Sequence, residues 1–125
     1  INEKGDKISS RKVQNLTYDE LLKSCDIGLS TVMLKKNLLN DAILFPELKT
    51  KEDYVLWLKI TEKGQTIAAF DKTLVEWRKC KFSLSSSTIR KLIDGYNVYR
   101  RYLGFGAIKS FYSLVILSIN YLRKK

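Results

Sequence analysis

The sequence predicts a mixed α/β fold, best described as an α+β fragment with few strands. Two observations lead to this class. The run Ile27–Leu34 is short, apolar and rich in residues typical of a buried strand, whereas residues 51–63 and 89–103 place apolar side chains at helical spacing. The chain has 125 residues, enough for about one domain. So small a sheet suggests a fragment whose remaining strands lie elsewhere.

The first half of the chain supplies a short helix and one strand. Residues 1–15 are polar and are expected to form a loop or an edge strand. Thr17 is a plausible N-cap, and Glu20 three residues later completes a capping-box pattern for a helix through Leu22. After the strand at Ile27–Leu34, the residues Lys35–Leu39 predict a turn of helix, and Phe45-Pro46 marks a loop.

The second half alternates helix and strand before two final helices. A helix over 51–63 ends at Gly64, which is suited to a C-cap. Further elements are expected in this order: strands at 66–70 and 74–79, a polar loop at 83–87, a helix from Ile89, a break at 104–106 and a last helix over 107–122. We divide the chain into a first part, residues 1–83, and a C-terminal helical extension, residues 84–125.

Charge and residue usage limit the possible chemistry. The net charge is +10, which fits an anionic partner such as nucleic acid, lipid headgroups or a phosphate-bearing substrate. The chain has no His, and Cys25 and Cys80 lack metal-site spacing, so a Cys/His metal centre and a His-based triad are excluded within it. Two free thiols fit a reducing cytoplasm, although one disulfide stays possible. Because the chain starts at Ile1 and its only Met is Met33, we expect a piece of a longer or processed protein.

The adjacent acids Glu52 and Asp53 open the helix over 51–63. On a helical wheel Glu52 shares a stripe with Lys59 and Lys63 that should face water, whereas Asp53 falls on the side that should pack inward. A structural interpretation is available, because Thr50 and Asp53 match a capping box and acids suit a first helical turn. A functional interpretation makes Asp53 a general base at the edge of a pocket, and the two do not exclude each other.

Several motifs occur together in a fixed order. They are Cys25-Asp26-Ile27-Gly28-Leu29-Ser30-Thr31-Val32-Met33, Phe45-Pro46, Lys51-Glu52-Asp53-Tyr54-Val55-Leu56-Trp57-Leu58-Lys59-Ile60, Trp77-Arg78 and Ser83-Leu84-Ser85. In order and spacing this set resembles the C-terminal half of bacterial family 2 glycosyltransferases with the GT-A fold. Such enzymes build capsular and lipopolysaccharide sugars.

The resemblance implies a Rossmann-like GT-A enzyme that transfers a sugar from a nucleotide-sugar donor to a saccharide or lipid-linked acceptor. It implies inversion at the sugar, with Asp53 deprotonating the acceptor hydroxyl and Glu52 supporting it or contacting the acceptor. It also implies a divalent metal, Mg or Mn, in the full-length enzyme, held by a DXD-type motif outside this chain. On this resemblance residues 1–83 are the acceptor-side part of the glycosyltransferase domain, and the fragment alone is expected to be inactive.

Five further residues are candidates for substrate binding on the same resemblance. Ser30 and Thr31 would line the acceptor side, although the alternative is an ordinary strand. Trp57 could stack on a sugar, but core packing is the favoured interpretation. Arg78 and Lys79 could contact the diphosphate, whereas a surface salt bridge explains Arg78 equally well. The pattern departs from the family here, since Trp77 replaces a Tyr and Cys80 stands where many relatives have His.

The C-terminal segment is apolar and flanked by basic residues. Phe111–Leu122 is about 12 residues long, short of the roughly 20 needed to span a bilayer, but suited to lying on an anionic membrane. The alternatives are packing against the missing half or a homodimer contact, and an unpaired sheet edge also favours a dimer. These observations predict a cytoplasmic protein, at the inner face of the membrane if its acceptor is lipid-linked.

A second class of function is a small basic module that binds membrane or nucleic acid without catalysis. Aromatic and basic residues interleave over 96–102, as they can on nucleic-acid surfaces. However, Tyr96 and Tyr99 fall on the apolar face of the predicted helix, so core packing is favoured for them. No recognised nucleic-acid motif is present, and we expect no nucleic-acid partner.

Overall fold

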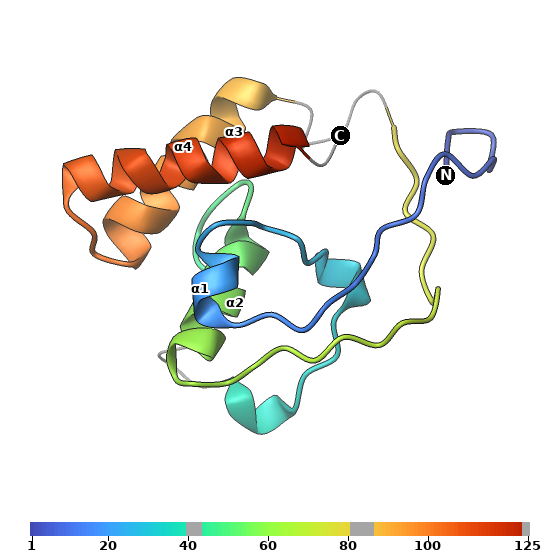
Figure 1. Ribbon diagram of the computed structural model, residues 1–125, viewed down its shortest axis with the longest axis horizontal. Coiled ribbons are helices and arrows are strands. Elements are labelled where there is room, and N and C mark those ends of the chain that lie inside the picture. The colour runs from blue at the N-terminus through green and yellow to red at the C-terminus, as the bar shows by residue number, and fades with distance from the viewer. Residues whose placement is uncertain (40–43, 81–86, 124–125) are drawn as a thin grey trace.

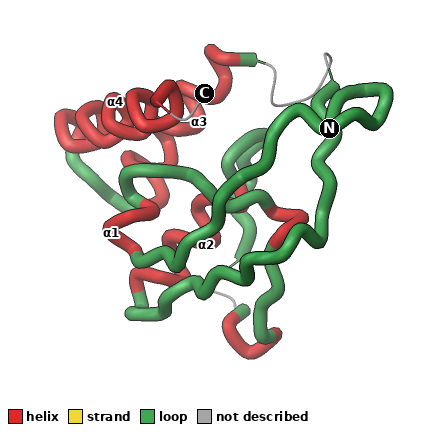
Figure 2. The backbone as a smooth tube through the Cα atoms, turned by 45° about the vertical axis from the view of Figure 1, so that its right-hand side comes forward, coloured by secondary structure: helices red, strands yellow, loops and turns green. Residues whose placement is uncertain are grey.

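The computed structural model describes residues 1–39, 44–80 and 87–123, and within them the chain is helical with long extended connections (Figures 1 and 2). The elements are α1 (Tyr18–Leu21), the 3-10 turns η1 (Leu29–Thr31) and η2 (Lys36–Leu38), α2 (Glu52–Glu62), α3 (Thr88–Asn97), the π-helical turn η4 (Val98–Tyr102) and α4 (Ala107–Arg123). α3 and α4 lie together over α1 and α2, and the boundary proposed between residues 83 and 84 falls outside the described residues.

α2 is the central helix and is buried on nearly every side. Its buried side chains are Tyr54, Val55, Leu56, Trp57, Leu58, Ile60 and Thr61. The helix predicted over 51–63 is confirmed to within a residue at each end, and Gly64 follows it with φ of 82°, a conformation that favours glycine. The predicted water-facing stripe is confirmed at Lys63, which is exposed, but Glu52 and Lys59 are half-buried because other segments surround the helix.

Two tyrosines join three helices in the core. The hydroxyl of Tyr54 donates to the carbonyl of Leu21 at 2.6 Å, and that of Tyr99 donates to the carbonyl of Leu22 at 2.8 Å. The two hydroxyl oxygens lie 3.0 Å apart. The pair therefore satisfies the carbonyls at the end of α1, which a helix end would otherwise leave unpaired, and holds α1 against α2 and η4. At the other end of α1, the predicted pairing of Glu20 forms, with the Thr17 N–H donating to its carboxylate at 2.8 Å.

The three predicted strands are absent from the described residues, which contain one isolated antiparallel bridge, Leu16 with Ile67 (Figure 2). In place of a strand at 27–34 the chain forms η1, because the hydroxyl and the N–H of Thr31 both donate to the carbonyl of Gly28, at 2.7 and 2.9 Å. The segment 66–79 stays extended beside the N-terminal residues without a continuous ladder. A strand needs a regular ladder of hydrogen bonds to its neighbour, and the described residues of these segments form isolated bonds instead.

The core packing favoured for Tyr99 is confirmed, since it is buried, but the N-terminal apolar residues of α3 face away from the core. Asp94 and Gly95 are buried near Thr50 and Lys51, which precede α2, whereas Ile89 is 73% exposed and Ile93 57% exposed. The cause is Asp94, whose carboxylate accepts from the hydroxyl of Thr50 at 2.6 Å and from its N–H at 3.2 Å. This paired, buried carboxylate fixes the rotation of α3 about its axis. The predicted break before α4 is confirmed, with φ of 68° at Gly104.

We expect Asp94→Ala to lower the free energy of unfolding of the intact protein by about 1–3 kcal/mol, because two buried donors of Thr50 lose their acceptor. Urea unfolding measures the change. Asp71→Ala, on an exposed extended segment, is the matched control and should alter stability little. Equal stability of the two variants would show that the Thr50–Asp94 pair does not hold α3 in place.

Candidate active site

The start of α2 carries the acids singled out in the sequence, and its backbone is unusual. Lys51, the N-cap residue of α2, has a φ of 66°. Among the described residues it is the only one other than glycine with a positive φ. A side chain in this left-handed conformation costs roughly 1–2 kcal/mol, which the surrounding contacts must offset. Those contacts include Gly95 of α3, where an added Cβ would lie 3.5 Å from Cε of Lys51. The entrance to α2 is therefore held in a strained form.

The capping box predicted between Thr50 and Asp53 is wrong. Both donors of Thr50 bind Asp94 of α3, so Thr50 is unavailable to cap α2. Asp53 instead accepts from the N–H of Tyr54 at 2.8 Å, which satisfies one donor of the first helical turn.

Asp53 is half-buried, as is Glu52 beside it, so the inward and outward orientations predicted for the two acids are not clearly separated. Burial raises the pKa of Asp53 above its usual range, and the neighbouring charge of Glu52 raises it further. The Tyr54 N–H bond and the ammonium of Lys51 oppose that rise. A carboxylate with a raised pKa is a stronger base than a solvated one, which is the property a general base requires.

Cys25 lies close enough to Asp53 to respond to its charge. Burial raises the pKa of the Cys25 thiol to about 11, and the charges of Lys51, Asp53, Asp26 and Arg11 also act on it. Charged groups of both signs, Lys51, Glu52 and Asp53, therefore lie together at the start of α2, and the Cys25 thiol responds to two of them. Cys25 and Lys51 belong to the sequence motifs, which gave them no role. No spacing pattern connects Cys25 with residue 53, so only the fold could show this.

Ser30 and Thr31 lie in η1 and are exposed. The hydroxyl of Thr31 is engaged with the carbonyl of Gly28, whereas Ser30 extends from the same turn. Trp57 is 2% exposed, so it packs in the core, the interpretation the sequence favoured, and offers no ring face to a sugar. Its buried Nε1–H has no hydrogen-bond partner among the described residues.

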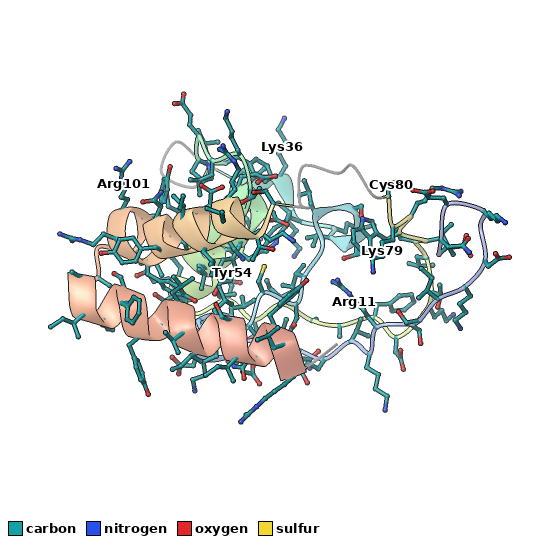
Figure 3. The ribbon with its side chains drawn as sticks, turned by 90° about the horizontal axis from the view of Figure 1, so that it is seen from above. Arg11, Lys36, Tyr54, Lys79, Cys80 and Arg101 are labelled. Atoms are coloured by element: carbon teal, nitrogen blue, oxygen red, sulfur yellow. The ribbon has the colours of Figure 1, made fainter. Side chains whose placement is uncertain are left out.

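Arg78 and Lys79 are exposed and lie apart from α2. The guanidinium of Arg78 donates to the carbonyls of Glu3 and Asn2 at 2.8 and 3.3 Å, and the diphosphate contact considered for it stays a prediction. In Figure 3 Lys79 lies beside Cys80 and apart from Tyr54, which follows Asp53 directly. The described chain therefore brings Glu52, Asp53, Lys51 and Cys25 together, but does not bring Arg78 or Lys79 to them.

The described residues hold no group of three His, Cys, Asp or Glu side chains that could bind a metal ion. The divalent metal that the resemblance implies, held outside this chain, stays a prediction. Within the same residues, no helix is both long and apolar enough to cross a bilayer.

Curated relatives identify the class of protein. A Bacillus subtilis protein assigned as a teichuronic acid biosynthesis glycosyltransferase, TuaG, is 30% identical over 112 residues, which are 90% of this chain and 44% of the relative. Two Escherichia coli enzymes also match, WfgD with 39% identity over 87 residues and WfaP with 36% over 111. They cover 68% and 87% of this chain, and 33% and 42% of their own lengths. Both are named UDP-Glc:α-D-GlcNAc-diphosphoundecaprenol β-1,3-glucosyltransferases.

This chain is homologous to bacterial glycosyltransferases, which confirms the resemblance carried by its motifs. It spans less than half the length of the curated relatives it matches. No protein-family model matches it, and no solved structure matches it significantly. The relatives do not favour a basic binding module without catalysis.

The raised pKa of Asp53 predicts a pH-dependent effect on stability. A carboxyl group whose pKa is higher in the folded state stabilises the fold below its ordinary value of 3.8, and this contribution is lost as pH rises through the folded-state pKa. Asp53→Asn should therefore be slightly more stable than the wild type at pH 7, by less than about 1 kcal/mol because the group is partly exposed.

The difference should vanish below pH 3.8, where both side chains are neutral. Thermal unfolding of the two proteins at both pH values measures it, with Asp71→Asn as a control for loss of an exposed carboxylate. A less stable Asn variant at neutral pH would contradict the raised pKa.

Proposed function

We propose that the intact protein is an inverting family 2 glycosyltransferase of the GT-A fold that transfers a sugar from a nucleotide-sugar to a saccharide or lipid-linked acceptor. The observation that carries this proposal is the position of Asp53 in a chain homologous to glycosyltransferases. It is a half-buried carboxylate with a raised pKa, in the first turn of the central helix. We propose that this transfer serves the synthesis of a bacterial surface polysaccharide.

The chemistry of two relatives suggests the substrates. WfgD and WfaP use UDP-glucose and a GlcNAc-diphosphoundecaprenol acceptor and form a β-1,3 linkage, according to their names. UDP-glucose is an α-glucoside, so a β product requires inversion at the anomeric carbon. Inversion in one displacement needs one base for the attacking hydroxyl and no protein nucleophile. A single carboxylate such as Asp53 fits that requirement, and UDP-glucose is the first donor to test.

In the proposed reaction the acceptor hydroxyl donates a hydrogen bond to Asp53 and transfers its proton to this carboxylate as the oxygen attacks the anomeric carbon. The bond from that carbon to the nucleotide diphosphate breaks at the same time. Glu52 supports the charge and position of Asp53, and its negative charge helps to keep the base strong. Ser30 and Thr31, exposed in η1, are the acceptor-side contacts we propose. Arg78 and Lys79 are kept as the diphosphate contacts on the resemblance alone, since the described chain holds them apart from the start of α2.

A divalent cation would neutralise charge on the leaving diphosphate in such a reaction. We propose that its ligands belong to the part of the enzyme outside this chain, as the resemblance implies. We place the enzyme in the cytoplasm at the inner face of the membrane, where a nucleotide-sugar and a lipid-linked acceptor can meet.

Asp53→Asn should lower kcat of the intact enzyme by about 10²–10⁴-fold, because the hydroxyl loses its proton acceptor while the helix start keeps its shape. UDP release from UDP-glucose in the presence of a GlcNAc-diphospholipid measures the loss. Glu52→Gln should cause a smaller loss, and Asp19→Asn, exposed on α1, should leave the rate unchanged. Full activity in Asp53→Asn would exclude Asp53 as the base.

Lys51→Met should move the acid limb of the pH–rate profile to higher pH by up to about 1 unit, since the ammonium of Lys51 lowers the pKa of Asp53. The profile of kcat/KM from pH 4 to 8 tests this. Lys63→Met, at the exposed end of the same helix, is the matched control. If the acid limb stays in place in Lys51→Met, the activity does not depend on ionisation of Asp53.

A further inference from the structure

The side of α4 that faces away from the rest of the chain is made of large apolar side chains. Their exposed fractions run from 39% at Val115 to 88% at Ile108. At about 100° per residue they form one continuous stripe along the helix. The outward stripe of α4 consists of Ile108, Phe111, Tyr112, Val115, Ile119 and Leu122.

The inward side of α4 is narrower and includes polar groups. Ser110 and Leu117 are buried, and the hydroxyl of Ser110 donates to the carbonyl of Gly106 at 2.9 Å. Asn120 donates to the carbonyl of Lys23 at 2.9 Å, which ties the far end of α4 to the residues after α1. Contacts along its whole length therefore fix the direction in which the apolar stripe points.

α3 adds a second apolar stripe on the same side of the molecule. Ile89, Leu92 and Ile93 are 73%, 44% and 57% exposed, whereas Asp94 and Gly95 are buried beneath them. α3 and α4 lie side by side over α1 and α2 (Figures 1 and 3). Because both helices turn their inward sides to the same layer, their outward stripes form one surface, which we call the α3–α4 face. Isolated apolar residues on a surface are ordinary, but nine on one face are not.

The charges around the α3–α4 face are of one sign. Residues 87–123 contain six basic side chains, and their single acid, Asp94, is buried against Thr50. The basic side chains are Arg90, Lys91, Arg100, Arg101, Lys109 and Arg123. The ammonium of Lys109 lies 3.9 Å from the ring centre of Phe105, at the start of α4, and Arg100 donates to the carbonyl of Phe105 at 3.2 Å. No negative charge on this pair of helices opposes an anionic partner.

We propose that the α3–α4 face is a membrane-binding surface, which lies on an anionic bilayer with its apolar stripes among the upper acyl chains and its cations at the headgroups. The arrangement matches the requirements of an interfacial helix: an apolar face, flanking Lys and Arg, and tyrosines with a polar tip. Tyr112, which is 66% exposed, occupies such a position in the outward stripe of α4. The direction of α4 is fixed by its contacts with the layer below, so it lies parallel to the membrane.

The charge pattern favours lipid over another protein segment as the occupant. A protein segment that covered the nine apolar residues would also need acids to match the basic side chains of these helices. An anionic bilayer supplies both the apolar layer and the negative charge without a specific sequence. The surface also does not require Asp53 or its chemistry. Membrane binding can therefore be tested separately from sugar transfer.

The test is sedimentation of the intact protein with vesicles of phosphatidylcholine alone, and of phosphatidylcholine and phosphatidylglycerol in equal parts. We expect binding to the anionic vesicles, which weakens with salt, and little binding to the neutral ones. The triple variant Phe111→Ser, Val115→Ser, Ile119→Ser should bind at least tenfold more weakly. Arg90→Gln with Arg101→Gln should weaken binding to anionic vesicles about tenfold or more and reduce its salt dependence.

Two controls keep the result specific. Met33 is an apolar residue that is 99% exposed and lies outside α3 and α4. The variant Met33→Ser should therefore bind vesicles as the wild type does. Asp53→Asn should also bind normally, because its effect is confined to transfer. Normal binding with no transfer in any variant would overturn the proposed activity alone, whereas transfer without vesicle binding would overturn the proposed surface.

Other occupants of the face would give different results. If the rest of the protein covers it, the triple variant loses thermal stability and the wild type does not bind vesicles. If a second copy covers it, light scattering shows a dimer that the triple variant disrupts, again without vesicle binding. Either outcome overturns the proposal.

Should the triple variant fail to fold, Tyr112→Trp tests the same face with a single exposed change. Its fluorescence should be quenched by lipids brominated near the headgroup. Absence of quenching in bound protein would overturn the orientation proposed here.

Discussion

The buried carboxylate of Asp94 is the constraint on which much of the structure depends. Its contacts with both donors of Thr50 join α3 to the residue that precedes the strained entrance to α2. A buried charge is tolerated only when it is well paired, so α3 cannot rotate without losing this pair. One interaction thus fixes the start of the central helix and also decides that the apolar side of α3 faces outward.

The same region explains why the candidate base has its properties. α2 is buried along most of its length and held by the Tyr54–Tyr99 pair, so its first turn is drawn into a partly desolvated position. Desolvation makes the Asp53 carboxylate more basic and also makes its ionised form unfavourable for folding. The property that suits Asp53 to catalysis is therefore one that reduces stability, as is common where function and folding compete.

The extended part of the molecule shows what a sheet requires. Leu16 pairs with Ile67, and the N-terminus of Ile1 donates to the carbonyl of Trp77 at 3.0 Å, so residues 1–16 and 66–79 run side by side. Apolar side chains on these segments remain exposed, including Leu74 at 75%. The residue pattern of these segments is compatible with strands, but a strand forms only when it has hydrogen-bonded neighbours. The matched relatives are more than twice as long as this chain, so they contain further segments that this chain does not.

The sequence by itself predicted the helices over 51–63, from Ile89 and over 107–122, the breaks at Gly64 and at 104–106 and the resemblance to glycosyltransferases, because helical spacing, caps and motif order are local properties. It also singled out Asp53. Only the tertiary structure decided that Thr50 binds Asp94 rather than capping α2, that Cys25 lies close enough to Asp53 to respond to its charge, and that apolar residues of α3 and α4 face outward. Helical periodicity shows that a helix has an apolar side, but the direction in which that side points is set by partners distant in the chain.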